Sequence, residues 1–304
     1  MTDRTFDASL EATGPWSFSE SVRFLEGFAP AAIETAGETA LRLAFVPDGA
    51  DEAIGVSIRP DDGRDDRVMV RIAGDVEPGI VVEQVRRILS LDHDGSGVID
   101  VARRDPVIGQ LWRERNYLRP VLFHSPYEAA AWAIIGNRIR IRQAARIKAE
   151  VARSLGTAIE VDGVPVHAFP APRNLAELTE FPGLSDRKVT WLRGIGEAAM
   201  NGLLRADRLR AMPPDDAIVA LCELKGIGPF GAELVLLRGA GEADRIPRHE
   251  SRFGRAVAMA HDLDAIPGPE ALATMAEGWR PYRTWVAVLL RSVLEEQTQE
   301  IASS

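Results

Sequence analysis

Two glycines on either side of one apolar residue mark the stretch whose residue types and spacing could carry chemistry. Residues 224–231 read LKGIGPFG and lead into a helix-permissive run. Glycine adopts positive φ without steric cost, so Gly226 and Gly228 permit a tight hairpin with Ile227 turned into the core. The amides that follow would face outward at a helix N-terminus, which is a natural seat for a phosphate. The pattern predicts a helix-hairpin-helix that holds a nucleic-acid backbone; an ordinary corner between two helices is the alternative.

An acidic residue follows this hairpin among several arginines. Residues 244–250 read DRIPRHE, and Arg252 and Arg255 lie on the next helical run. Together with the hairpin, this segment resembles the bacterial DNA-3-methyladenine glycosylase II family of the helix-hairpin-helix DNA glycosylase superfamily. In that family a D-x-F-P segment precedes the catalytic aspartate, and Glu250 stands at the aligned position with one more methylene. The resemblance is clear over residues 92–295 and loose before them.

The resemblance implies a DNA N-glycosylase that removes alkylated or otherwise damaged bases from duplex DNA as a monomer, in base excision repair. Such an enzyme extrudes the nucleotide, and a carboxylate stabilises the oxocarbenium character of the sugar. Glu250 would have this catalytic role; a helix N-terminal carboxylate favoured by the helix dipole is the alternative. A lesion-binding protein without catalysis on the same fold is the second interpretation, and a helical scaffold without a DNA role is the third.

The hairpin also bears on the mechanism. Bifunctional relatives have a lysine at the position of Phe230, where it forms a Schiff base, and Lys225 lies on the wrong side of the turn. The resemblance therefore implies a monofunctional hydrolase that requires no cofactor. It further implies that backbone carbonyls in the hairpin hold a structural monovalent cation, namely those of Cys222, Leu224 and Ile227.

The remaining DNA contacts are carried over from matching positions. Asn137 and Arg138 stand where family members have a Gly-Gln-x-x-Ser segment, whose side chains fill the gap left by the extruded base. Arg146, Lys148 and Arg153 are expected on a solvated helix face. The predicted DNA-binding residues are Asn137, Arg138, Arg140, Gly226, Ile227, Gly228, Phe230, Gly231 and Arg252.

The expected base pocket departs from the family pattern. Leu234 and Arg291 fall where family members often have a tyrosine and a tryptophan. Arg291 would repel a cationic base if it points inward, so the substrate could differ from 3-methyladenine. Trp132, Tyr282 and Trp285 fit either a pocket or a core. The predicted pocket residues are Trp132, Phe230, Leu234, Tyr282, Trp285 and Arg291.

The composition is typical of a globular protein. The 304 residues are 46% hydrophobic and 27% charged, enough for one large or two modest domains. The single cysteine, Cys222, excludes an intrachain disulfide and a four-cysteine iron–sulfur cluster. Without a long apolar run or an apolar signal segment, we expect a cytoplasmic, nucleoid-associated protein.

The charge is unevenly distributed. The net charge is −9, which by itself disfavours DNA binding. Residues 1–110 carry 11 basic and 21 acidic side chains, so the remainder has a net charge of +1. Basic side chains gather within residues 138–153 and 245–255. Because phosphate contacts act over roughly 8 Å at physiological salt, these clusters matter more than the total, and the acidic part is expected to face away from DNA.

The expected fold class is α+β, with a small N-terminal antiparallel-sheet domain before an all-α helix-hairpin-helix core. Strand-like runs at residues 38–46, 52–59 and 67–73 are separated by turn residues and followed by helical spacing at 81–91. Further along, Ser125 and Ser185 are expected helix caps, and 161–172 is an expected proline-rich connector. The predicted domains are 1–90, the core 91–295 and a polar tail 296–304.

Overall fold

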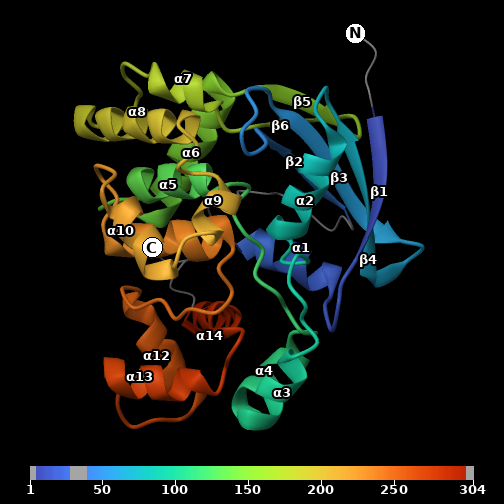
Figure 1. Cartoon of the computed structure of the whole chain (residues 1–304), viewed down its shortest axis with the longest axis vertical. Helices are drawn as coiled ribbons and strands as arrows, with labels where there is room; N and C mark the ends of the chain where they lie inside the picture. Colours follow the sequence, from blue (N-terminus) through green and yellow to red (C-terminus); the bar gives the residue numbers. More distant parts are fainter. Residues whose placement is uncertain (1–4, 28–39, 299–304) are drawn as a thin grey trace.

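The N-terminal part of the chain is an antiparallel sheet with two helices packed on it (Figure 1). The computed structural model describes residues 5–27 and 40–298. The helices are α1 (Phe18–Gly27) and α2 (Pro78–Ile88), and their apolar faces share one core with the sheet. The strand order is β1-β4-β3-β2, with β1 at Thr5–Glu11, β2 at Leu41–Phe45, β3 at Ile54–Asp61 and β4 at Arg64–Ala73.

The three predicted strands correspond to β2, β3 and β4, and the predicted helix at 81–91 overlaps α2. Residues 38 and 39 of the first predicted strand lie outside the described residues. Neither β1 nor α1 was expected from the sequence. Only Leu10 is buried among the residues of β1, an edge strand. Phe6, Ala8 and Leu10 alternate with polar residues along β1, so a strand signal was present in the sequence although only one of these side chains is buried.

A hairpin replaces the proline-rich connector predicted at 161–172. Strands β5 (Ala158–Val161) and β6 (Val164–His167) pair around Asp162 and Gly163, both with positive φ. An Asp-Gly pair between two short strands is the usual signal for such a turn. The Asp162 carboxylate accepts a hydrogen bond from Arg59 at 2.7 Å and one from Ser57, which fixes the hairpin to the sheet.

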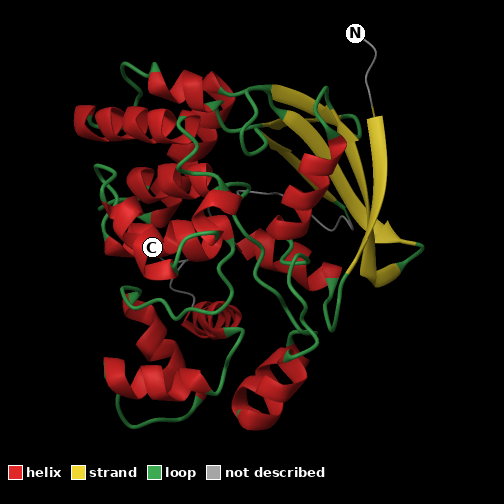
Figure 2. Ribbon diagram, in the orientation of Figure 1, coloured by secondary structure: helices red, strands yellow, loops and turns green. Residues whose placement is uncertain are grey.

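The rest of the described chain is mostly helical and forms two groups around separate apolar cores (Figures 1 and 2). The first group surrounds α5 and the second surrounds α14. The first comprises α5 (Pro126–Ile135), α6 (Ile141–Leu155), α7 (Pro172–Ala176), α8 (Asp186–Met200), α9 (Ala206–Arg210), α10 (Pro214–Cys222), α11 (Pro229–Leu234) and the π-helix η1 (Val235–Ala240). The second comprises α3 (Val98–Arg104), α4 (Pro106–Glu114), α12 (Ser251–Ala260), α13 (Pro269–Glu277) and α14 (Arg283–Thr298).

Both predicted serine caps are confirmed. The Ser125 hydroxyl accepts a hydrogen bond from the Glu128 amide at 3.1 Å, and the Ser185 hydroxyl accepts one from the Lys188 amide at 3.4 Å.

Lys148 is not on the solvated face of α6, because its ammonium lies 3.1 Å from the buried Glu128 carboxylate. Burial opposes ionisation of Glu128, but His124 and Lys148 hold its pKa at about 2.

Helix α14 continues through Thr298, past the predicted start of the polar tail. Glu296 accepts two hydrogen bonds from the Arg115 guanidinium, at 2.7 and 2.6 Å. The last turn of α14 is thereby joined to the end of α4. Residues 299–304 of the predicted tail lie outside the described residues.

His261 provides a pH-dependent contact between α12 and α4. Its Nε2 lies 3.0 Å from Asp105 Oδ2, which raises the pKa of His261 although burial opposes this. A histidine with a raised folded-state pKa stabilises the fold below its unfolded pKa, and this stability is lost as pH rises through the folded pKa. We expect His261→Gln to lower the free energy of unfolding by about 1 kcal/mol near pH 5.5 and by less near pH 9, measured by urea denaturation. Equal losses at both pH values would contradict this role.

Candidate active site and nucleic-acid interface

A cavity of about 1180 Å³ lies where the two helical groups and α1 meet. Its wall is formed by the end of α5, the turn before α11, the start of α12 and one face of α14. Segments that are distant in sequence therefore meet at one site. The predicted site residues that line the cavity are Trp132, Asn137, Arg138, Gly226, Gly228, Phe230, Gly231, Leu234, Glu250, Arg252 and Arg291.

Tyr282 and Trp285 do not belong to this cavity, which corrects their assignment to the base pocket. They are 5% and 3% exposed and lie in the core of the second helical group. The Tyr282 hydroxyl donates to the Asp94 carbonyl, and the Arg119 guanidinium lies 5.1 Å from the Trp285 ring centroid. Residue type alone does not separate a core aromatic from a pocket aromatic. The other predicted site residues outside the cavity wall are Arg140, Cys222, Leu224 and Ile227.

The predicted hairpin between α10 and α11 is present. Gly226 has φ +92°, and a Cβ there would lie 2.6 Å from the Trp191 ring, so the turn requires glycine. Ile227 is 4% exposed and fills the core beneath the turn, as expected. Gly228 directly precedes α11, and Phe230 in the first turn is 47% exposed and faces the cavity. The hairpin thus presents backbone and one aromatic ring at the cavity rim.

Gly228 allows the role of the hairpin to be tested without disturbing the fold. A Cβ at this position would meet no atom within 4 Å, and its φ of −92° suits any residue. We expect Gly228→Asp to weaken binding to duplex DNA about tenfold, because its charge would face a phosphate. Gly228→Ala is the matched control and should bind like the wild type. Binding measured by fluorescence anisotropy should weaken with salt at a slope of about −0.9 per phosphate contacted. Unchanged binding by Gly228→Asp would exclude the hairpin as the clamp.

Glu250 is positioned by contacts from two helices. It is the N-cap of α12, and its Oε1 accepts the Arg252 amide at 3.2 Å. Its Oε2 lies 2.5 Å from Nη1 of Arg291 on α14, and the Arg252 Nε is 3.5 Å from Oε1. The Arg291 guanidinium also pairs with Glu295. The carboxylate therefore caps a helix and lies in the cavity wall, and its extra methylene extends it to Arg291.

A second carboxylate, not identified from the sequence, holds the turn before Glu250. Glu233 on α11 is 2% exposed and accepts the amides of Arg248 at 3.0 Å and His249 at 2.9 Å. Its Oε1 also lies 3.1 Å from Nδ1 of His249. Because buried carboxylates need such partners, Glu233 connects the hairpin helix rigidly to the turn that carries Glu250.

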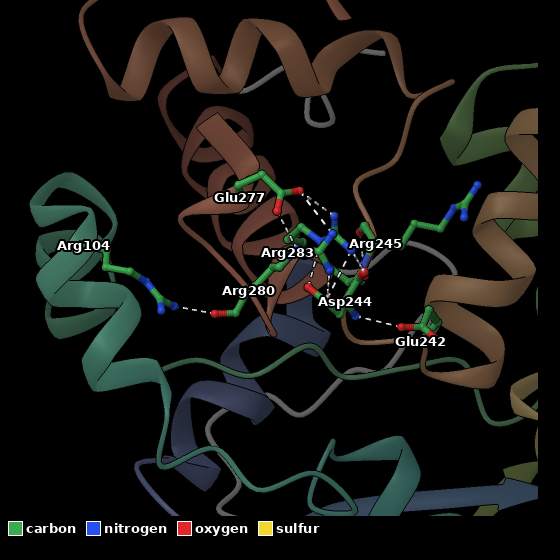
Figure 3. Close-up of polar contacts among 8 residues, drawn as sticks. Arg104, Glu242, Asp244, Arg245, Glu277, Arg280 and Arg283 are labelled. Carbon is green, nitrogen blue, oxygen red and sulfur yellow. Dashed lines mark hydrogen bonds and ion pairs between the residues drawn. The ribbon is translucent and has the colours of Figure 1, made fainter. Parts of the chain in front are cut away.

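A network of charged residues fixes the start of the same loop to α14 (Figure 3). The Asp244 carboxylate accepts hydrogen bonds from Arg283 at 2.8 Å and from Arg280 at 2.9 Å. Arg245 donates its amide to the Thr284 hydroxyl at 3.2 Å. The loop from 241 to 250 is therefore held at one end by α14 and at the other by Glu233.

Arg138 occupies an unusual backbone conformation at the junction between α5 and α6. Its φ is +57°, which is rare for a residue with a side chain and is often retained at functional sites. Arg138 is exposed and lines the cavity beside Asn137. Among the described residues, Arg138, Arg140 and Arg142 contact no carboxylate, so their charges are available to an anionic partner.

Comparisons with known proteins agree with this arrangement. No family model matches the chain. A DNA-3-methyladenine glycosylase of Bacillus subtilis is 24% identical over 219 residues, which cover 70% of this chain and 72% of the relative. A solved 3-methyladenine DNA-glycosylase from Archaeoglobus fulgidus has a TM-score of 0.76 at 22% identity, covering 93% of this chain and 96% of that one.

A solved 8-oxoguanine glycosylase/lyase of Clostridium acetobutylicum, in complex with double-stranded DNA, has a TM-score of 0.61 at 16% identity. The match covers 84% of this chain and 88% of that one. These likenesses confirm the predicted α+β fold class.

Over residues 5–27 and 40–298, every helix is too short or too polar to span a bilayer. Over the same ranges, no three His, Cys, Asp or Glu side chains are grouped as metal ligands.

Proposed function

Since the chain belongs to the helix-hairpin-helix DNA glycosylase family, we propose that it is a monofunctional N-glycosylase for damaged bases in duplex DNA. The position of Glu250 is the observation that supports this most strongly. Its carboxylate lies in the wall of a cavity whose rim carries the hairpin and Arg138. Base excision requires three parts: a carboxylate near the sugar, a motif that holds the DNA backbone, and a side chain that fills the gap left by the extruded base.

Extrusion of the nucleotide costs a few kcal/mol. The hairpin at Gly226 and Gly228 offsets part of this cost by holding the phosphate backbone, and Asn137 and Arg138 occupy the gap in the duplex. The base enters the cavity beside Trp132 and Phe230, two aromatic residues of its lining. Aromatic faces stack on any base, so these rings favour entry of a base without selecting among them.

The C1′–N bond then breaks, with its electron pair going to the departing base and positive charge to the sugar. The Glu250 carboxylate stabilises this cation and takes a proton from the water that attacks C1′. The Arg252 amide holds the carboxylate in place. The products are a free base and an abasic site in an intact strand.

The absence of a suitable amine supports a monofunctional reaction. Strand cleavage by a bifunctional enzyme uses an amine that forms a Schiff base with the sugar. Phe230 occupies the hairpin position of that lysine, and the cavity-lining residues that the structure describes include no lysine. The enzyme is therefore proposed to release the base by hydrolysis alone.

The proposed reaction requires no cofactor, and the proposed enzyme acts as a monomer at chromosomal DNA. A structural monovalent cation at the hairpin fits the oxygen donors there, because hard cations bind carbonyl oxygens. The Leu224 carbonyl already accepts the Ile227 amide at 3.0 Å. A carbonyl oxygen has a second lone pair, so Leu224 can hold the ion together with the carbonyls of Cys222 and Ile227.

A panel of duplexes, each with one damaged base, tests the proposed function. We expect free base from at least one lesion, with one alkali-labile abasic site formed per base released. Borohydride should trap no covalent adduct between protein and DNA. An adduct that persists after the N-terminal amine is blocked would refute the monofunctional reaction, and no base from any lesion would refute glycosylase activity.

A further inference from the structure

Two arginines place guanidinium groups in the cavity wall, and one of them contacts Glu250. Arg291 on α14 and Arg238 on η1 both line the cavity. The Arg291 guanidinium contacts the carboxylates of Glu250 and Glu295, while its buried Nε has no hydrogen-bond partner among the described residues. The Arg238 guanidinium donates to the Val121 carbonyl at 2.8 Å and lies 5.3 Å from the centroid of the Phe24 ring.

Both arginines are charged at neutral pH. Burial opposes the charge on Arg291, but the Glu250 and Glu295 carboxylates raise its pKa above the ordinary value. Burial, with the nearby Arg291, lowers the pKa of Arg238 to about 10, which still leaves it protonated. A base that enters the cavity therefore meets two charged guanidinium groups, and that of Arg291 is paired with the Glu250 and Glu295 carboxylates. The face of the Phe24 ring, which could otherwise attract a cation, already lies against Arg238.

The charge of the base determines how these guanidinium groups affect catalysis. A purine methylated at N3 or N7 is cationic in DNA and departs as a neutral molecule, so it needs no stabilisation of the leaving group. A neutral damaged base departs with both electrons of the C1′–N bond, and negative charge develops on its ring. A guanidinium beside the ring repels the first kind of base and stabilises the second as it leaves.

We propose that this site is specific for neutral damaged bases with carbonyl or ring-nitrogen acceptors, and that Arg291 stabilises the negative charge on the departing base. The inference rests on the proposed glycosylase function. Arg291 then has two roles: it orients Glu250 in the free enzyme and it donates hydrogen bonds to the base in the complex. The electron pair of the broken bond goes to the base, which is protonated after departure, and water supplies the hydroxyl at C1′.

The test compares duplexes with one hypoxanthine or one 1,N6-ethenoadenine, both neutral, and one 7-methylguanine, which is cationic. Single-turnover rates of base release are divided by the spontaneous rate for the same duplex, because the cationic base is intrinsically labile. We expect the wild type to accelerate release of a neutral base more than release of 7-methylguanine. Arg291→Gln should lower this preference about 10- to 100-fold, and Arg291→Lys, which keeps the charge, should retain most of it.

The ratio of the acceleration for a neutral base to that for 7-methylguanine distinguishes leaving-group stabilisation by Arg291 from a purely structural role. Loss of the Arg291 contact to Glu250 would slow release of all bases alike and would leave the preference unchanged. Equal slowing of both classes by Arg291→Gln, in a variant with wild-type circular dichroism, would therefore overturn the proposal. Release of 7-methylguanine alone would also overturn it while supporting the glycosylase function. Release of no base by the wild type would refute that function and this inference with it.

Discussion

Replacement of Glu250 by glutamine is expected to slow base release on the order of a thousandfold, while binding to lesion-bearing duplex stays near the wild-type level. The substitution removes the negative charge beside C1′ but keeps the size of the side chain. Its amide oxygen can still accept the Arg252 amide that now binds Oε1 at 3.2 Å, so the cap of α12 is preserved. Single-turnover release and fluorescence anisotropy on the same duplex measure the two quantities.

Glu295→Gln is the matched control for Glu250→Gln. Glu295 also lines the cavity and contacts Arg291, but it lies on α14 and does not cap α12. We expect loss of the Glu295 charge to slow base release less than tenfold, because this charge affects the electrostatic potential of the site without taking part in the reaction. If Glu295→Gln slowed release as much as Glu250→Gln does, the general loss of negative charge would explain both results, and Glu250 would have no special role.

Glu233→Gln is expected to slow base release about a hundredfold, because a misplacement of about 1 Å in a catalytic group can have that effect. The Glu233 carboxylate accepts the amides of Arg248 and His249 just before Glu250. Glutamine offers one oxygen, and its amino group would face a backbone N–H. We also expect a loss of about 1–3 kcal/mol in the free energy of unfolding, the usual cost of a buried group left without a partner.

Two comparisons distinguish positioning from loss of fold in Glu233→Gln. The rate is measured at saturating enzyme and at a temperature where circular dichroism matches that of the wild type. Glu197→Gln, at an exposed position on α8, is the control for the chemical change. A Glu233→Gln variant that is less stable but releases base at the wild-type rate would show that Glu233 supports the fold alone.

Local backbone chemistry explains what could be predicted from the sequence. The glycines at 226 and 228 permit the hairpin, which uses the positive φ of Gly226, and Ser125 and Ser185 cap helices through short-range hydrogen bonds. Three strands of the sheet were recognised by their runs of β-branched residues and by the turn residues between them, whereas the alternation of Phe6, Ala8 and Leu10 in β1 was a signal that was not used. The Asp-Gly turn of the β5–β6 hairpin carried a local signal that could have been used.

Long-range contacts explain what could not be predicted. The sequence around Glu233 does not show that its carboxylate accepts hydrogen bonds from two amides of the turn that follows η1. The sequence position of Arg291 raised the question of whether it points inward, but the contact with Glu250 depends on how α14 packs beside α12. Tyr282 and Trp285 have the right side chains for a pocket, and only the tertiary structure places them in a core.

Whether the Glu250 carboxylate serves hydrolysis in this chain is decided most directly by single-turnover base release from wild type and Glu250→Asp across the lesion panel. The extra methylene of glutamate lets the carboxylate lie 2.5 Å from Nη1 of Arg291, and aspartate is too short to keep both this contact and the α12 cap. We therefore expect the wild type to release base faster than Glu250→Asp, which should keep partial activity because it keeps the charge. If the wild type released no base while Glu250→Asp did, the protein would be a lesion-binding protein that has lost catalysis.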